Sequence, residues 1–255
     1  MKLSNYHTHS RYCDGKDSLE ELAEEAIRLD CPELGFSGHS HVPFDDCCMS
    51  PEGTEAYIRE VRALKERCKD RIRILLGIEQ DYYGDLPVDE YDYVIGSVHY
   101  IGRNGVFLFV DEGRESQERA VREYYDGDYY AFIEDYYRLV GELYEKTRCT
   151  IVGHFDLVTK FNEDGSLFDN AHPRYRRAAL DALDKLCQTP VLFEINTGAI
   201  ARGYRTTPYP ESFLLRELER RGRGLILSSD CHDKRQLLYG LESLRGCAKG
   251  IREKL

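Results

Sequence analysis

Residues 73–79 read Arg-Ile-Leu-Leu-Gly-Ile-Glu, a short apolar run that ends on a carboxylate. Its length and its branched aliphatic side chains predict a buried β-strand. Six other short runs predict strands of the same kind, at residues 3–8, 34–38, 93–98, 150–154, 191–196 and 225–230. Helical patterns separate most of these runs, so the chain predicts consecutive βαβ units with parallel strands. Right-handed crossovers over seven such units would close the sheet into a distorted (β/α)7 barrel.

Helix-start signals and apolar periodicity locate the expected helices. Ser18 and Glu21 form a capping-box pattern ahead of an amphipathic stretch, and Ser50-Pro51 begins a second helix. Further helices are expected near residues 115–147, 173–188, 210–221 and 236–253. No internal repeat or flexible linker divides the chain, whose length suits one α/β barrel. We therefore expect a single domain over residues 1–255.

Composition narrows the class of protein. The net charge of −11 would repel a phosphate backbone, which argues against a nucleic-acid partner. The polar start of the chain and the absence of an 18-residue apolar run predict no signal peptide, no membrane span and a cytoplasmic location. The nine cysteines are odd in number and contain no C-x-x-C pair. Reduced thiols are therefore expected rather than a disulfide framework or a zinc ribbon.

Metal-ligand side chains fall at the C-terminal ends of six of the seven expected strands. The segments are His7-Thr8-His9, Gly38-His39-Ser40-His41, Gly77-Ile78-Glu79, Ser97-Val98-His99, Gly153-His154-Phe155-Asp156 and Ser229-Asp230-Cys231-His232. In a parallel barrel these ends share one face, and alternation along a strand turns both ends of H-x-H or D-x-H to the same side. Imidazole and carboxylate ligands suit Zn, Mn or Fe. Their number exceeds the need of one tetrahedral ion, so we expect two or three divalent metals at the C-terminal rim, bridged by Glu79.

Such a cluster favours phosphoester hydrolysis, because it can activate water and neutralise phosphoryl oxygens. The segment after the sixth strand, which lacks a metal ligand, carries Arg202 and Arg205, and arginine suits bidentate phosphate contact. Lys160 is a weaker candidate for the same contact. Asp156 could support a metal ligand or protonate the leaving alcohol, and the sequence does not separate these roles.

These six motifs, in this order along nearly the whole chain, resemble the PHP (polymerase and histidinol phosphatase) superfamily. Asn196-Thr197-Gly198 with the arginines that follow, together with the chain length, resembles more closely the monofunctional histidinol-phosphate phosphatases of bacterial histidine biosynthesis. The resemblance implies a trinuclear centre, phosphate contacts from Arg202 and Arg205, and a His41 that faces substrate phosphate. It assigns His7, His9, Glu79 and Asp230 to one metal, Glu79, His99 and His154 to a second, and Asp14, His39 and His232 to a third.

The expected reaction is hydrolysis of L-histidinol phosphate to L-histidinol and phosphate, so the expected partner is a small phosphorylated substrate. The alternatives are a PHP-type phosphoesterase for another small phosphate or nucleotide, an amidohydrolase, and a non-catalytic metal-binding module. An amidohydrolase would normally have eight strands and a lone Asp after the last one, whereas Asp230 is paired with His232 here. The sequence does not determine the oligomeric state.

Overall fold

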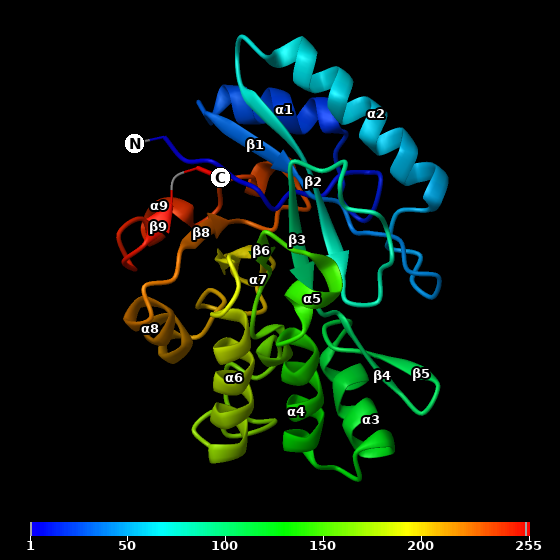
Figure 1. Ribbon diagram of the computed structural model, residues 1–255, viewed down its shortest axis with the longest axis vertical. Helices are drawn as coiled ribbons and strands as arrows, with labels where there is room; N and C mark the ends of the chain where they lie inside the picture. Colours follow the sequence, from blue (N-terminus) through cyan, green and yellow to red (C-terminus); the bar gives the residue numbers. More distant parts are fainter. Residues whose placement is uncertain (1, 253) are drawn as a thin grey trace.

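The computed structural model describes residues 2–252 and 254–255, and a seven-stranded sheet forms its centre. All neighbouring strands of this sheet run parallel, as predicted, in the order β1-β2-β3-β6-β7-β8-β9. The sheet curls, and helices pack outside it (Figure 1). Its strands are β1 (Glu33–Phe36), β2 (Arg73–Asp81), β3 (Tyr93–Ser97), β6 (Ile151–Val152), β7 (Leu192–Asn196), β8 (Leu225–Ser228) and β9 (Ile251–Arg252).

The N-terminal segment, expected to form a strand over residues 3–8, instead makes single bridges to two neighbours. Asn5 pairs with Leu34 of β1, and Thr8 pairs with Cys231, just beyond β8. Each neighbour is paired through a single bridge only, so the segment forms no continuous ladder of hydrogen bonds with β1 or with the chain after β8. The segment nevertheless links β1 to the chain that follows β8, and so brings His7 and His9 beside the last strands.

The helices lie mainly where sequence patterns predicted them. They are α1 (Leu19–Arg28), α2 (Pro51–Cys68), α3 (Arg114–Tyr124), α4 (Tyr129–Val140), α5 (Leu143–Thr147), α6 (Pro173–Leu186), α7 (Gly198–Ala201), α8 (Ser212–Arg220) and α9 (Leu241–Leu244), with 3₁₀ turns η1 (Leu157–Thr159) and η2 (Lys234–Gln236). α1 and α2 flank β1 and β2, whereas α4 and α6 pack side by side (Figure 1). None of the helices in the described part of the chain is long and apolar enough to cross a membrane.

Two predicted helices were wrong in their extent. The continuous helix over residues 115–147 is divided into α3, α4 and α5. The break between α3 and α4 occurs because Asp126 and Gly127 both have positive φ, 53° and 81°. A right-handed helix cannot continue through left-handed residues, and Asp128 then caps α4. The helix expected over residues 236–253 is replaced by η2, α9 and β9, with three positive-φ glycines between residues 240 and 250; residue 253 lies outside the described residues.

A β-hairpin between β3 and α3 was not predicted. It pairs β4 (Tyr100–Arg103) with β5 (Val106–Phe109) through a turn at Asn104-Gly105, whose φ angles are 51° and 81°. Asn-Gly between short apolar runs is a strong hairpin signal, because both central residues of a type I′ turn need positive φ. The hairpin carries Tyr100 and Phe109 to the edge of the metal-ligand region.

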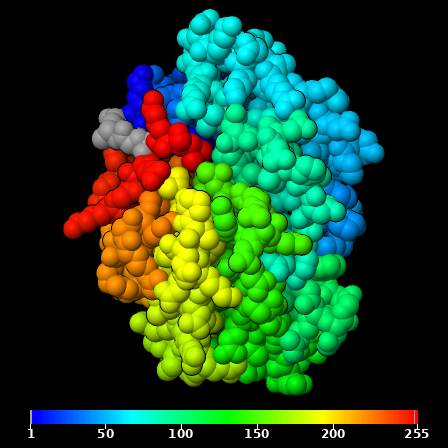
Figure 2. All heavy atoms as spheres, in the orientation of Figure 1, coloured from blue at the N-terminus to red at the C-terminus, as the bar shows by residue number. Residues whose placement is uncertain are grey.

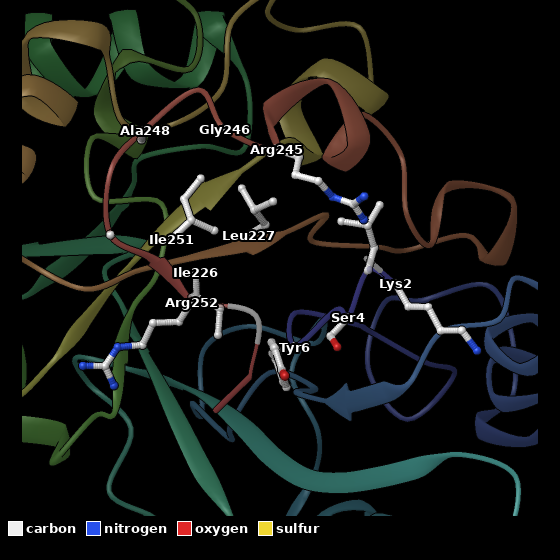
Figure 3. A pocket seen from close by; sticks show the side chains of 12 residues that line it. Lys2, Ser4, Tyr6, Ile226, Leu227, Arg245, Gly246, Ala248, Ile251 and Arg252 are labelled. Carbon is white, nitrogen blue, oxygen red and sulfur yellow. The ribbon is translucent and has the colours of Figure 1, made fainter.

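The two ends of the chain lie together, away from the strand ends that carry the histidines. Figure 2 shows the N-terminal and C-terminal segments adjacent on one face, and the Leu255 amide donates to the Tyr6 hydroxyl at 3.3 Å. A cavity of about 320 Å³ lies here, with Ile226, Leu227 and Ile251 forming its apolar wall (Figure 3). The cavity beside the two ends of the chain is therefore separate from the predicted metal ligands.

Loss of the first helix cap should weaken the fold measurably. The Glu21 amide donates to Ser18 Oγ at 3.2 Å, and Glu21 accepts from the Ser18 amide at 2.9 Å. We expect Ser18→Ala to lower the free energy of unfolding by about 1 kcal/mol, because it leaves the Glu21 amide without its capping acceptor. Urea denaturation of the metal-free protein measures the change. An unaltered midpoint and slope would contradict the capping role.

Candidate metal centre

Glu79 lies at the end of β2, and five imidazoles surround its carboxylate. The residue is 1% exposed, and its two oxygens point to different histidines. Oε2 is 3.1 Å from His7 Nε2, 3.4 Å from His9 Nε2 and 3.1 Å from His39 Nδ1, while Oε1 is 3.4 Å from His99 Nε2 and 3.1 Å from His154 Nε2. One carboxylate thus joins five imidazoles from four segments that are far apart in the sequence, an arrangement suited to a bridging ligand.

Two further carboxylates border the same histidines. Asp230 Oδ1 lies 3.6 Å from His7 Nε2 and 3.3 Å from His9 Nε2. Asp14 follows the first segment in a loop and lies nearer the surface, with its oxygens 3.6 Å from His9 Nδ1, 3.7 Å from His39 Nε2 and 3.1 Å from His232 Nε2. The Asp14 side is partly exposed, whereas the Asp230 side is buried.

Backbone pairing explains why these segments meet. Single parallel bridges join Thr8 to Cys231 and His39 to Glu79. Alternation around Thr8 turns His7 and His9 to the same side. Asp230 has a φ of 48°, outside the extended region, and its Oδ1 lies 3.5 Å from His232 Nδ1. Cys231 is buried, and its thiol donates to the Asp233 carbonyl rather than contacting the histidines.

The donor set fits divalent metal ions. Among the described residues, His7 Nε2, His9 Nε2 and Glu79 Oε2 are buried without a hydrogen-bond partner. A buried polar atom left unpaired costs about 1–3 kcal/mol, so three converging ones indicate a ligand that completes them. Ligand atoms lie within 4.8 Å of one another in four groups: His9, Asp14, His39 and His232; His7, His9 and Asp230; His7, Glu79 and His154; and His39, Glu79 and His99. All nine predicted metal ligands are in these groups.

The charges of the centre perturb one another strongly. Burial opposes protonation of His7, but the carboxylates of Glu194, Glu79 and Asp230 outweigh burial and hold the His7 pKa well above its usual value. Burial would also raise the pKa of Glu79, yet the surrounding histidines hold it well below the usual range. His9 behaves differently, because burial and the neighbouring His232 and His39 lower its pKa to about 3. The carboxylates therefore favour protonation of His7, whereas burial and the neighbouring histidines disfavour protonation of His9.

We expect metal affinity to rise with pH. A ligand histidine must be deprotonated at the atom that binds metal, and the His7 pKa is raised in the metal-free protein, so binding displaces a proton and weakens as the pH falls below that pKa. Calorimetric titration with Mn²⁺ in buffers of different ionisation enthalpy would count the protons released. An affinity that stays constant between about pH 6 and about pH 8, with no proton release, would contradict this coupling.

A cavity of about 550 Å³ opens beside the centre and is lined by several of its ligands and by Arg202 and Lys160. The Arg202 guanidinium donates to Asp230 Oδ2 and to the Asp230 carbonyl, both at 2.9 Å. Lys160 Nζ donates to Asp111 Oδ2 at 2.9 Å, and burial alone would raise the pKa of Asp111, but Lys160 lowers it to about 2. Asp111 also lines the cavity and was missed in the sequence, where it follows a hairpin strand that was not predicted.

Three other predicted site residues do not line this cavity. Arg205 is buried, donates to the Thr159 carbonyl at 3.2 Å and stacks over Tyr209. His41 Nδ1 lies 3.1 Å from the Met49 carbonyl. Asp156 is fully buried, accepts from the Glu211 amide at 2.8 Å, and has its pKa raised to about 7, mainly by burial. The predicted contact of these three side chains with substrate therefore stays a prediction, and their positions outside the cavity lining do not support it.

Sequence reasoning also missed two buried carboxylates that hold ligand histidines from behind. Glu194 Oε1 is 2.6 Å from His7 Nδ1, and Asp81 Oδ2 is 3.2 Å from His99 Nδ1. Both lie on strands, and Asp81 is two residues beyond Glu79 on the same face. A charged residue inside an apolar strand was the available signal, because such a side chain needs a buried partner.

The chain is similar to known proteins in both sequence and fold. The model of the PHP domain family matches residues 5–198. The histidinol-phosphatase of Bacillus subtilis is 26% identical over 95% of this chain and 98% of its own length. A probable histidinol-phosphatase of Deinococcus radiodurans is 30% identical over 90% of this chain and 86% of its own length. The Lactococcus lactis histidinol phosphate phosphatase, solved with zinc, L-histidinol and phosphate, superposes with a TM-score of 0.70 at 23% identity, over 97% of this chain and 93% of its own.

Proposed function

This chain belongs to the PHP domain family, and from that premise we propose that it hydrolyses L-histidinol phosphate to L-histidinol and phosphate. The observation that carries the proposal is the convergence of nine metal-type side chains around Glu79, beside a cavity that Arg202 lines. The relatives named histidinol-phosphatase, which align along most of the chain, support this substrate over other phosphomonoesters. The chain would work as one domain.

We propose two or three divalent ions, Zn, Mn or Fe, as cofactors. The nine residues of the four groups would hold them, with Glu79 shared between ions. Bound there, such ions supply an activated water and neutralise charge on phosphoryl oxygens. The chain itself supplies the dry, shaped donor set, since His7, His9 and Glu79 are almost wholly buried.

Arg202 is the residue proposed to bind and orient the phosphoryl group. Its guanidinium is held by Asp230 and lies 3.0 Å from His232 Nδ1, so its position is tied to the ligands themselves. A guanidinium has five N–H donors, and these contacts leave some of them for phosphoryl oxygens. Lys160, anchored by Asp111 in the same cavity, would add a second positive charge.

Phosphate release tests the proposal directly. The protein would be stripped of metal with a chelator, reloaded separately with Mn, Zn and Fe, and assayed on L-histidinol phosphate, other small phosphomonoesters and a nucleotide. We expect the highest kcat/KM for L-histidinol phosphate and a loss of turnover in His9→Ala. A higher kcat/KM for another ester would show that the proposed substrate is wrong. Inertness toward every phosphomonoester would show that the proposed phosphatase activity is wrong.

The cavity also suggests how the amine of the substrate is selected. Asp46 and Glu112 line it together with Phe44 and Phe109, so negative charge and aromatic surface border the same space. We expect the double variant Asp46→Asn/Glu112→Gln to raise KM for L-histidinol phosphate about tenfold, because a charge-assisted contact is lost. Phenyl phosphate, which has no cation, should be hydrolysed with unchanged KM. Equal changes for both esters would contradict charge recognition, and the remote Glu55→Gln serves as control.

A further inference from the structure

Strand β7 contributes no predicted metal ligand, yet its Glu194 lies directly behind the centre and is 1% exposed. Both of its oxygens accept hydrogen bonds. Oε1 accepts from Ser228 Oγ and lies 2.6 Å from His7 Nδ1, while Oε2 accepts from the His154 amide at 2.8 Å and from Asn196 Nδ2 at 2.9 Å. The carboxylate is thus fully used, and two of its partners belong to metal-ligand residues.

This contact determines which nitrogen of His7 carries hydrogen. A carboxylate oxygen can only accept a hydrogen bond, and two acceptors facing each other at 2.6 Å would repel. Nδ1 of His7 therefore carries a hydrogen and donates it to Glu194. A neutral imidazole with hydrogen on Nδ1 has its lone pair on Nε2. His7 Nε2 is the atom that faces Glu79 and Asp230 and has no hydrogen-bond partner among the described residues.

The same carboxylate is connected through Asn196 to the short helix that precedes Arg202. Asn196 donates to Glu194, and its Oδ1 accepts from the Gly198 amide at 2.8 Å. Gly198 begins α7, which ends one residue before Arg202. One buried network therefore connects the His7 ring, the backbone at His154 and the short helix that presents Arg202.

We propose that Glu194 is a positioning residue, which orients His7 Nε2 toward metal and so controls metal affinity in the two groups that contain His7. The inference rests on the proposed metal-dependent function. In the described structure no hydrogen bond or ion pair joins Glu194 to His9, Asp14, His39 or His232, so this outer group should bind independently of it.

Glutamine cannot replace Glu194 without conflict. Each carboxylate oxygen faces donors: the His7 ring and Ser228 on one side, and the amides of His154 and Asn196 on the other. In one orientation the NH₂ group of Gln would face the His154 and Asn196 amides, which only donate; in the other it would donate to His7 Nδ1 and so leave the ring hydrogen on Nε2. Glu194→Gln therefore replaces one of the two acceptor oxygens by a donor with almost no change in volume.

The test compares Glu194→Gln with Glu33→Gln, a matched buried carboxylate. Glu33 is 2% exposed and accepts from Tyr6 and Arg73, so its loss should affect stability and leave metal binding unchanged. Zinc content per chain and affinity would be measured by chelator competition and calorimetry, with thermal unfolding as the folding check. We expect Glu194→Gln to weaken its inner zinc sites about 10- to 100-fold and to keep the outer site at wild-type affinity.

Spectroscopy provides a readout that does not need metal or turnover. In ¹⁵N-histidine-labelled, metal-free wild type, we expect a downfield proton bound to His7 Nδ1, present in Glu33→Gln and absent in Glu194→Gln. Absence of that proton in the wild type, equal weakening of all zinc sites, or wild-type affinity in Glu194→Gln would overturn the proposal. If wild type binds zinc as described but hydrolyses no phosphoester, the proposed function fails while the role of Glu194 stands.

Discussion

Glu79→Gln is expected to lower phosphate release by at least about 10³-fold. Lewis-acid assistance contributes several kcal/mol, and each 1.36 kcal/mol is a factor of ten in rate. Both oxygens of Glu79 face imidazole nitrogens, so an amide would turn a donor toward one set of histidines whichever way it is oriented. Steady-state kinetics with L-histidinol phosphate, together with metal content by elemental analysis, would measure both consequences.

The neighbouring residue provides a control for Glu79→Gln. Gln80 is buried on the same strand, next to Glu79, but alternation turns it to the other face. Gln80→Glu changes charge there, and we expect it to affect stability more than metal content. If Glu79→Gln retained its full metal content and turnover, Glu79 could not be a metal ligand of the centre.

Arg202→Ala is expected to lower kcat by about 10²- to 10³-fold, the range found when one preorganised donor to a developing negative charge is removed. The Arg202 guanidinium lines the cavity and is held by Asp230, so it is already oriented before substrate enters. Single-turnover and steady-state kinetics would separate the loss of turnover from a loss of substrate affinity. The same measurements on Arg202→Lys would test whether geometry matters as well as charge.

Arg205→Ala is the informative comparison, because both arginines occur in one short loop. Arg205 donates to Thr159 and Thr207 and lies over Tyr209. We expect its loss to lower the unfolding temperature and to change kcat far less than Arg202→Ala does. If the two variants lose turnover equally while Arg205→Ala keeps wild-type stability, phosphate binding must be shared between them.

The sequence by itself determined the class of fold and the set of metal-type residues. Short apolar runs alternating with helical patterns predicted a parallel sheet, which the structure contains. The ligand segments could be found because their signal is local: a period of two keeps His7 and His9 on one side, and parallel strands bring their ends to one rim. Eight of the nine predicted ligands follow from these segments, and Asp14 was assigned only through the resemblance to the PHP superfamily.

Only the tertiary structure decided what lies behind and beside those ligands. Glu194 meets His7 from a strand 187 positions away, and long side chains such as Arg205 and His41 turn toward whichever backbone acceptor the fold provides. The helix break at Asp126-Gly127 likewise depends on backbone angles that the apolar pattern does not encode. Local spacing selects which side of a strand a residue occupies, whereas hydrogen-bond partners are selected by the packing of distant segments.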